Sequence, residues 1–177
     1  PTTQMMRKAG DESGPHFPGT IADQINVSLV QSAPPYSVVA SSVNTALNQN
    51  GTSTASFSSA LSGIYYLKIN HRNSIESWSS TPVSFTGNSI SYNFSDSPSK
   101  IYGNNSILKG GKYCLFGGDA NQDGSVDTGD MTPIDNDASA FTSGYVVTDI
   151  NGDGIVDTGD VTIVDNNGSA FVGAVHP

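Results

Sequence analysis

The sequence predicts a mainly β protein, in which a β-sandwich is followed by a small repeated segment with short helices. Candidate strands of about four to eight residues, separated by turn residues, follow one another from Ile25 to about Leu115. Only 13% of the residues are charged, while Ser, Thr, Asn and Gly are abundant. After Phe116 the chain repeats itself. We therefore expect an N-terminal extension (1–20), a β-sandwich (21–116) and a C-terminal repeat (117–177).

The N-terminal extension mixes Gly, Pro, charged and polar residues without any period. This composition is typical of a tail that does not fold by itself. We expect contact to order it, either with its own domain or with a neighbouring molecule.

The sandwich is predicted from strand spacing and alternation. In the segment 65–70, Tyr65, Leu67 and Ile69 fall on one face of a strand and the polar residues between them on the other. Asn50-Gly51 suits the positive φ angles of a tight hairpin turn. Strands at intervals of roughly 8 to 12 residues favour an immunoglobulin-like sandwich. The segment also resembles the prealbumin-like or carboxypeptidase-regulatory-like sandwiches of secreted proteins.

Charge is distributed very unevenly. The formal net charge is -9, all seven Lys and Arg lie at or before Lys112, and residues 113–177 hold 11 of the 16 acids. A segment with this many acidic residues repels nucleic acid, so nucleic acid is not expected as a partner. The segment also needs bound cations to neutralise its charge. No stretch approaches the roughly 18 apolar residues that a membrane span requires.

The C-terminal repeat has an offset of 30 residues, from Asp119 to Asp149. Between 119–141 and 149–171, 15 of 23 aligned residues are identical. Each copy begins with a 12-residue loop, DANQDGSVDTGD or DINGDGIVDTGD, that places oxygen donors at positions 1, 3, 5, 7, 9 and 12. Calcium takes six to eight oxygen ligands and is bound by loops with this register, whereas zinc requires His or Cys and magnesium a smaller octahedral shell.

The sequence therefore predicts two calcium ions. Gly124 and Gly154 take the sharp turn at position 6, and Val126 and Val156 point inward. Ser125 and Ile155 contribute backbone carbonyls and the other ligands their side chains. The predicted ligands are Asp119, Asn121, Asp123, Ser125, Asp127, Asp130, Asp149, Asn151, Asp153, Ile155, Asp157 and Asp160.

A short helix is expected after each loop, capped by Asp127 or Asp157. Pro133 disfavours a long helix in the first copy. No helix former precedes either loop, so an EF-hand's entering helix is not expected. A loop followed by one helix, with Asp at position 12, duplicated near a C-terminus, resembles the dockerin module. That resemblance implies a secreted, calcium-dependent assembly role with a cohesin-like partner, although MTPIDND and VTIVDNN lack the basic residues of dockerin helices.

Catalysis is not expected, because no serine or cysteine motif with His and carboxylate partners is evident. We predict a noncatalytic extracellular calcium-binding module of a cell-surface or filamentous assembly, which associates with itself head-to-tail through the N-terminal segment. One alternative is a dockerin-type module that tethers a larger enzyme or adhesin to a cohesin-like protein. Another is a carbohydrate-binding module that stacks glycans on Trp78, although packing in the core is favoured for this residue.

Overall fold

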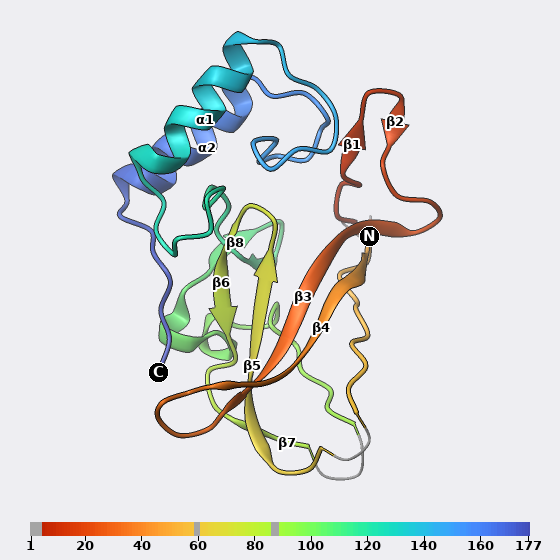
Figure 1. Cartoon of the computed structure of the whole chain (residues 1–177), viewed down its shortest axis with the longest axis vertical. Coiled ribbons are helices and arrows are strands. Elements are labelled where there is room, and N and C mark those ends of the chain that lie inside the picture. The colour runs from red at the N-terminus through yellow and green to blue at the C-terminus, as the bar shows by residue number, and fades with distance from the viewer. Residues whose placement is uncertain (1–4, 59–60, 86–88) are drawn as a thin grey trace.

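The structure is a computed structural model that describes residues 5–58, 61–85 and 89–177. Its main element is a five-stranded antiparallel sheet (Figure 1). Four strands lie side by side in the order β4 (Val38–Asn48), β3 (Ile21–Gln31), β5 (Ile64–His71) and β6 (Ser74–Trp78), and β7 (Val83–Ser84) pairs with the start of β5. Two hairpins are formed by β1 (Gly10–Asp11) with β2 (Gly14–Pro15) and by β8 (Ile107–Lys109) with β9 (Lys112–Cys114). The predicted mainly β class is confirmed.

The described strands form one large sheet and two hairpins rather than two sheets of similar size. Residues 89–94, which lie within the range of candidate strands, form no regular strand. They are followed by two short 3₁₀ turns, η1 (Pro98–Lys100) and η2 (Tyr102–Asn104). The Tyr92 hydroxyl donates a hydrogen bond of 2.6 Å to the Lys100 carbonyl, and Ile101 is fully buried beside Ser79. Side-chain hydrogen bonds therefore hold this irregular segment against the end of β6.

The repeat contains two helices of equal length, α1 (Thr128–Ser139) and α2 (Thr158–Ser169). Each begins with a reciprocal capping box, in which the N-cap Asp and the Asp three residues later bond to each other's backbone. The expectation that Pro133 shortens the first helix is wrong, because α1 continues through it. The capping box and the complete burial of Ile134 offset the cost of about 3 kcal/mol that an interior proline carries.

The sheet and the repeat share one apolar cluster. Ile75 on β6 is 1% exposed and packs with Val126, Ile134, Val156 and Val164 of the repeat. The inward orientation predicted for Val126 and Val156 is confirmed. A strand of the sheet thus completes the core of the two-helix segment, which lies beyond the end of the sheet (Figure 1).

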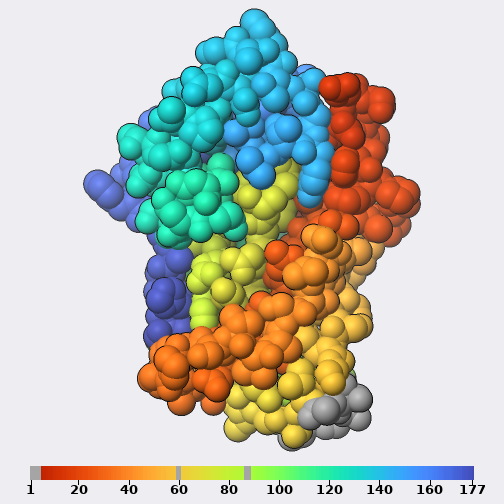
Figure 2. Space-filling view, in the orientation of Figure 1, coloured from red at the N-terminus to blue at the C-terminus, as the bar shows by residue number. Residues whose placement is uncertain are grey.

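Residues 5–20 lie along their own chain. The Met6 N–H donates to the Gln49 carbonyl, Ala9 to Ala22, and Gly10 to Gly152 of the second loop. Figure 2 shows this N-terminal part beside the loop of the second copy. Residues 1–4 of the predicted extension lie outside the described residues. Among the helices of the described ranges, none has both the length and the apolar character of a membrane span.

Candidate functional site

The two predicted calcium loops have nearly the same backbone. Gly124 and Gly154 adopt φ values of 90° and 88°, a region that favours glycine, and so make the sharp turn expected at position 6. The last carboxylate of each loop folds back over the first residues. Asp130 accepts hydrogen bonds from the N–H groups of Asn121 and Asp127, at 3.1 and 3.0 Å. Asp160 accepts the equivalent bonds from Asn151 and Asp157, at 2.9 and 3.0 Å.

Each loop is closed by the segment that follows the helix of the other copy. In the first loop, the Gly124 carbonyl accepts from Ala174 N–H at 2.7 Å. In the second, the Gly154 carbonyl accepts from Gly144 N–H at 2.8 Å. The predicted carbonyl donors Ser125 and Ile155 lie in isolated β-bridges with Gly173 and Ser143, respectively. The two copies therefore interlock, and neither loop is complete without the other copy.

The first carboxylate of the first loop, Asp119, is buried and lies near other carboxylates. Asp119 is 2% exposed, and its Oδ1 atom has no hydrogen-bond partner among the described residues. Burial, together with the nearby Asp130 carboxylate, raises the pKa of Asp119 to about 6. A buried polar atom without a partner costs about 1–3 kcal/mol, and more when it is charged. A cation bound at Oδ1 would remove this cost.

The donor set fits calcium by chemical type. Each loop offers carboxylates, the amide oxygen of Asn121 or Asn151, and a backbone carbonyl, which are the hard oxygen ligands that calcium prefers. In the described part of the chain, no group of three or more His, Cys, Asp or Glu side chains could hold a metal ion. An ion would therefore depend on the amide and carbonyl oxygens as well as the carboxylates. Calcium binding by the twelve predicted ligands stays a prediction.

A polar cleft of about 300 Å³ opens beside the first loop. It is lined by Asp119, Asp123 and Gly124 of the loop, by Asn70 and Glu76 of the sheet, and by the C-terminal segment near His176. The cleft gives solvent and ions a path to the carboxylates of the first loop.

Comparisons with known proteins do not assign a family. No protein-family model matches the chain, and no curated protein sequence matches it. The chain is similar in structure to a chain in each of two crystal structures of type II cohesin–X–dockerin complexes from Acetivibrio cellulolyticus, which are an N-terminal and a C-terminal interface mutant. The first match has 22% identity and a TM-score of 0.49 and covers 82% of this chain and 80% of that chain. The second match has 21% identity and a TM-score of 0.48, and it covers 86% of this chain and 83% of that chain.

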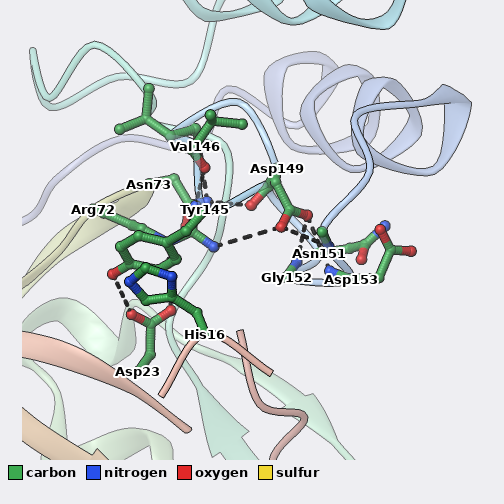
Figure 3. Close-up of polar contacts among 12 residues, drawn as sticks. His16, Asp23, Arg72, Asn73, Tyr145, Val146, Asp149, Asn151, Gly152 and Asp153 are labelled. Atoms are coloured by element: carbon green, nitrogen blue, oxygen red, sulfur yellow. Dashed lines mark hydrogen bonds and ion pairs between the residues drawn. The ribbon is translucent and has the colours of Figure 1, made fainter. Parts of the chain in front are cut away.

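Arg72, at the turn between β5 and β6, connects the sheet to the second loop (Figure 3). Its guanidinium donates to the Val146 carbonyl and lies 4.6 Å from the centre of the Tyr145 ring. Nε is 3.4 Å from Asp23 on β3, and Nη2 is 3.9 Å from Asp149, the first residue of the second loop. One side chain thus joins β3, the β5–β6 turn and the repeat.

Asp23 and Tyr145 complete this connection. The Tyr145 hydroxyl donates a hydrogen bond of 2.6 Å to Asp23, and the His16 ring stacks on the Tyr145 ring at 4.1 Å. Burial raises the pKa of Asp23, but contacts with His71 and Tyr145 outweigh burial and hold this pKa far below its usual range. Burial, followed by the Asp23 carboxylate, raises the pKa of Tyr145. Asp23 is therefore ionised and Tyr145 neutral at physiological pH.

Sequence reasoning missed this connection. Its members lie in three distant parts of the sequence, near residues 16–23, 72 and 145–149, so no local pattern could indicate that they meet. The aromatic ring considered for glycan stacking is not available, because Trp78 is 6% exposed and its Nε1 donates to Glu76 at 2.9 Å. The carbohydrate-binding alternative therefore loses the surface on which it depended.

Proposed function

We propose that the chain is a noncatalytic, extracellular protein-interaction module in which two calcium ions brace a dockerin-like repeat against a β-rich domain. The observation that carries the calcium part is the buried, unpartnered Oδ1 of Asp119 in a loop whose register of oxygen donors is duplicated 30 residues later. Calcium at this position neutralises carboxylates whose mutual repulsion otherwise opposes folding. Two ions would change the formal charge from -9 to about -5, since each carries two charges.

The contacts between the sheet and the repeat support a fixed arrangement of the two parts. Ile75 of the sheet lies within the core of the repeat, and Arg72 bonds to Val146. Asn73, which is 1% exposed, donates to the Val147 and Asp149 carbonyls at 3.2 and 2.8 Å. A partner bound to the helices would therefore be held at a defined orientation to the sheet.

Two exposed phenylalanines mark the surface that we propose for partner binding. Phe141 and Phe171 occupy equivalent positions just after α1 and α2 and are 88% and 92% exposed. Aromatic side chains are frequent anchors of protein interfaces. The helices also present exposed carboxylates, such as Asp135 and Asp165, and contain no Lys or Arg. The fitting partner is a cohesin-like protein with apolar pockets bordered by basic side chains.

The contacts of the N-terminal segment favour this function over head-to-tail polymerisation. The backbone bonds of Met6, Ala9 and Gly10 are made with the chain's own sheet and second loop. To add to a neighbouring sheet edge, the segment would first lose these bonds.

Catalysis is also disfavoured, although Ser74, His71 and Asp23 are connected in series. Ser74 Oγ is 3.2 Å from His71 Nδ1, and His71 Nε2 is 3.1 Å from Asp23. In the described part of the chain, the clefts of about 290 and 300 Å³ beside the two loops are lined by residues other than Ser74 and His71. Asp23 is also bound by Arg72 and Tyr145, so these contacts join structural elements.

The test is capture by immobilised cohesin modules with calcium or with a chelator, using the intact chain and a Phe141→Asp, Phe171→Asp double variant. A Val43→Asp variant, at a 65% exposed position on the sheet edge, serves as the control. We expect calcium-dependent capture that the double variant loses and the control keeps. Capture that resists the chelator, or self-association without cohesin binding, would overturn the proposal.

A further inference from the structure

The two loops are nearly identical in sequence but have different cationic neighbours. The ion pairs in the described residues include none that reaches the first loop, 119–130. The second loop, 149–160, meets two arginines, Arg7 at Asp153 and Arg72 at Asp149. Because the repeat itself contains no Lys or Arg, both cations come from earlier parts of the chain.

Arg7 contacts two of the predicted calcium ligands directly. Its Nη1 donates a hydrogen bond of 3.1 Å to Asn151 Oδ1 and lies 3.3 Å from Asp153 Oδ2. These residues occupy positions 3 and 5 of the second loop. The equivalent residues of the first loop, Asn121 and Asp123, bond instead to each other, with Asn121 Nδ2 at 2.8 Å from Asp123 Oδ2. The guanidinium therefore uses oxygens in the second loop that calcium would require.

The backbone on either side fixes the position of Arg7. Met6 N–H bonds to Gln49, and Ala9 N–H bonds to Ala22 on β3. Gly10 N–H bonds to the Gly152 carbonyl at 3.0 Å, and a Cβ on Gly10 would lie 2.5 Å from the backbone of Asp153. The segment thus lies directly on the second loop, and the Arg7 side chain is presented to it by an anchored backbone.

We infer that Arg7 is an intramolecular competitor for calcium in the second loop, so that the first loop fills first. This inference rests on the proposed calcium function. A divalent ion and a guanidinium repel each other, so the two cannot both bind strongly to the same two oxygens. Arg72, 3.9 Å from Asp149, further lowers the attraction of the second loop for cations. In the described ranges, no Lys or Arg forms an ion pair with the first loop, which contains the unpartnered Asp119 oxygen.

Displacement of the Arg7 side chain leaves the rest of the segment in place. The backbone bonds of Ala9 and Gly10 involve the carbonyls of Ala22 and Gly152, which are not predicted ligands. The Arg7 side chain is 61% exposed and can move into solvent without disturbing a core. Calcium that binds in the second loop therefore displaces one side chain. The contacts that Arg7 loses on displacement lower the calcium affinity of that loop.

The experiment is a calcium titration of the full chain followed by the amide NMR signals of Gly124 and Gly154, one in each loop, in a chelator-buffered solution. The variant is Arg7→Ala. The control is Lys8→Ala, which removes the same charge one residue later from a side chain that bonds to the Gly19 carbonyl.

In the unchanged chain, we expect Gly124 to respond at lower calcium than Gly154. Arg7→Ala should increase the calcium affinity reported by Gly154 about fivefold, the effect of removing one competing surface ion pair. Lys8→Ala should change it less than twofold. Simultaneous filling in the unchanged chain, or an equal effect of the two substitutions, would overturn the role of Arg7 while leaving calcium binding intact. If neither glycine responds to calcium, the proposed function itself fails.

Discussion

Replacing Ile75 with Ala tests whether the sheet and the repeat unfold together. Ile75 belongs to β6 but is 1% exposed within the core of the repeat. The substitution removes the equivalent of three methylene groups, or about 2.4 kcal/mol at about 0.8 kcal/mol each. The cavity adds to this loss, so we expect the free energy of unfolding to fall by about 3–4 kcal/mol. Ile64→Ala is the matched control, because Ile64 is 57% exposed and should cost less than about 1 kcal/mol.

Two spectroscopic probes separate the two parts of the molecule. Trp78, the single tryptophan, lies on β6, and the α-helices of the described residues, α1 and α2, lie in the repeat. Denaturant unfolding is therefore followed by tryptophan fluorescence and by circular dichroism at a helical wavelength. We expect Ile75→Ala to move both transitions by the same amount. A shift confined to the helical signal would refute the shared core, as would a loss no larger than that of Ile64→Ala.

Three further predictions follow from the contacts between the parts. Asp23→Asn removes the carboxylate that lies closer to Arg72 and should cost about 3 kcal/mol at pH 7. Because contacts lower the pKa of Asp23, its stabilising effect is present above pH 4 and declines as the pH falls. The difference in melting temperature between the variant and the unchanged chain should therefore shrink in acid, and a difference that stays constant would contradict this. Gly10→Ala should cost about 1–3 kcal/mol in denaturant unfolding, since its Cβ meets the Asp153 backbone, whereas Lys8→Ala should cost little; equal losses would exclude close packing. A calcium chelator should lower the unfolding midpoints of both probes, and unchanged midpoints would count against bracing by calcium.

The local features of the repeat could be predicted because they depend on short-range sequence. The duplication, the turn at Gly124 and the caps at Asp127 and Asp157 all follow from residues close to one another in the chain. The continuation of α1 through Pro133 was not predicted, because burial of Ile134 against the shared core is a tertiary effect. Helix propensity and capping residues correctly predicted where each helix begins. They wrongly predicted that the first helix would be short.

The features that join the parts could not be predicted from sequence. Strand alternation predicted that Leu67 lies on the apolar face of its strand, and Leu67 is buried. Alternation did not predict that Ile75 on the next strand completes the core of the repeat. The contact of Arg7 with Asn151 spans 144 residues, and no pattern in a single sequence connects the two. The irregular segment at 89–94 alternates apolar and polar residues like a strand, yet it lies among loops that side-chain hydrogen bonds hold in place. Such long-range contacts are set by the fold as a whole.

The most direct test of the account is the number of calcium ions that the folded chain binds. Native mass spectrometry of the chain, after removal of metals and addition of calcium or magnesium in excess, counts the bound ions without assuming a function. We predict two calcium ions, with magnesium failing to replace them at equal concentration. The Asp119→Ala variant, which loses the buried first carboxylate, should bind one. An intact, folded chain that binds no calcium, or two ions that persist in the Asp119→Ala variant, would contradict the assignment of the loops.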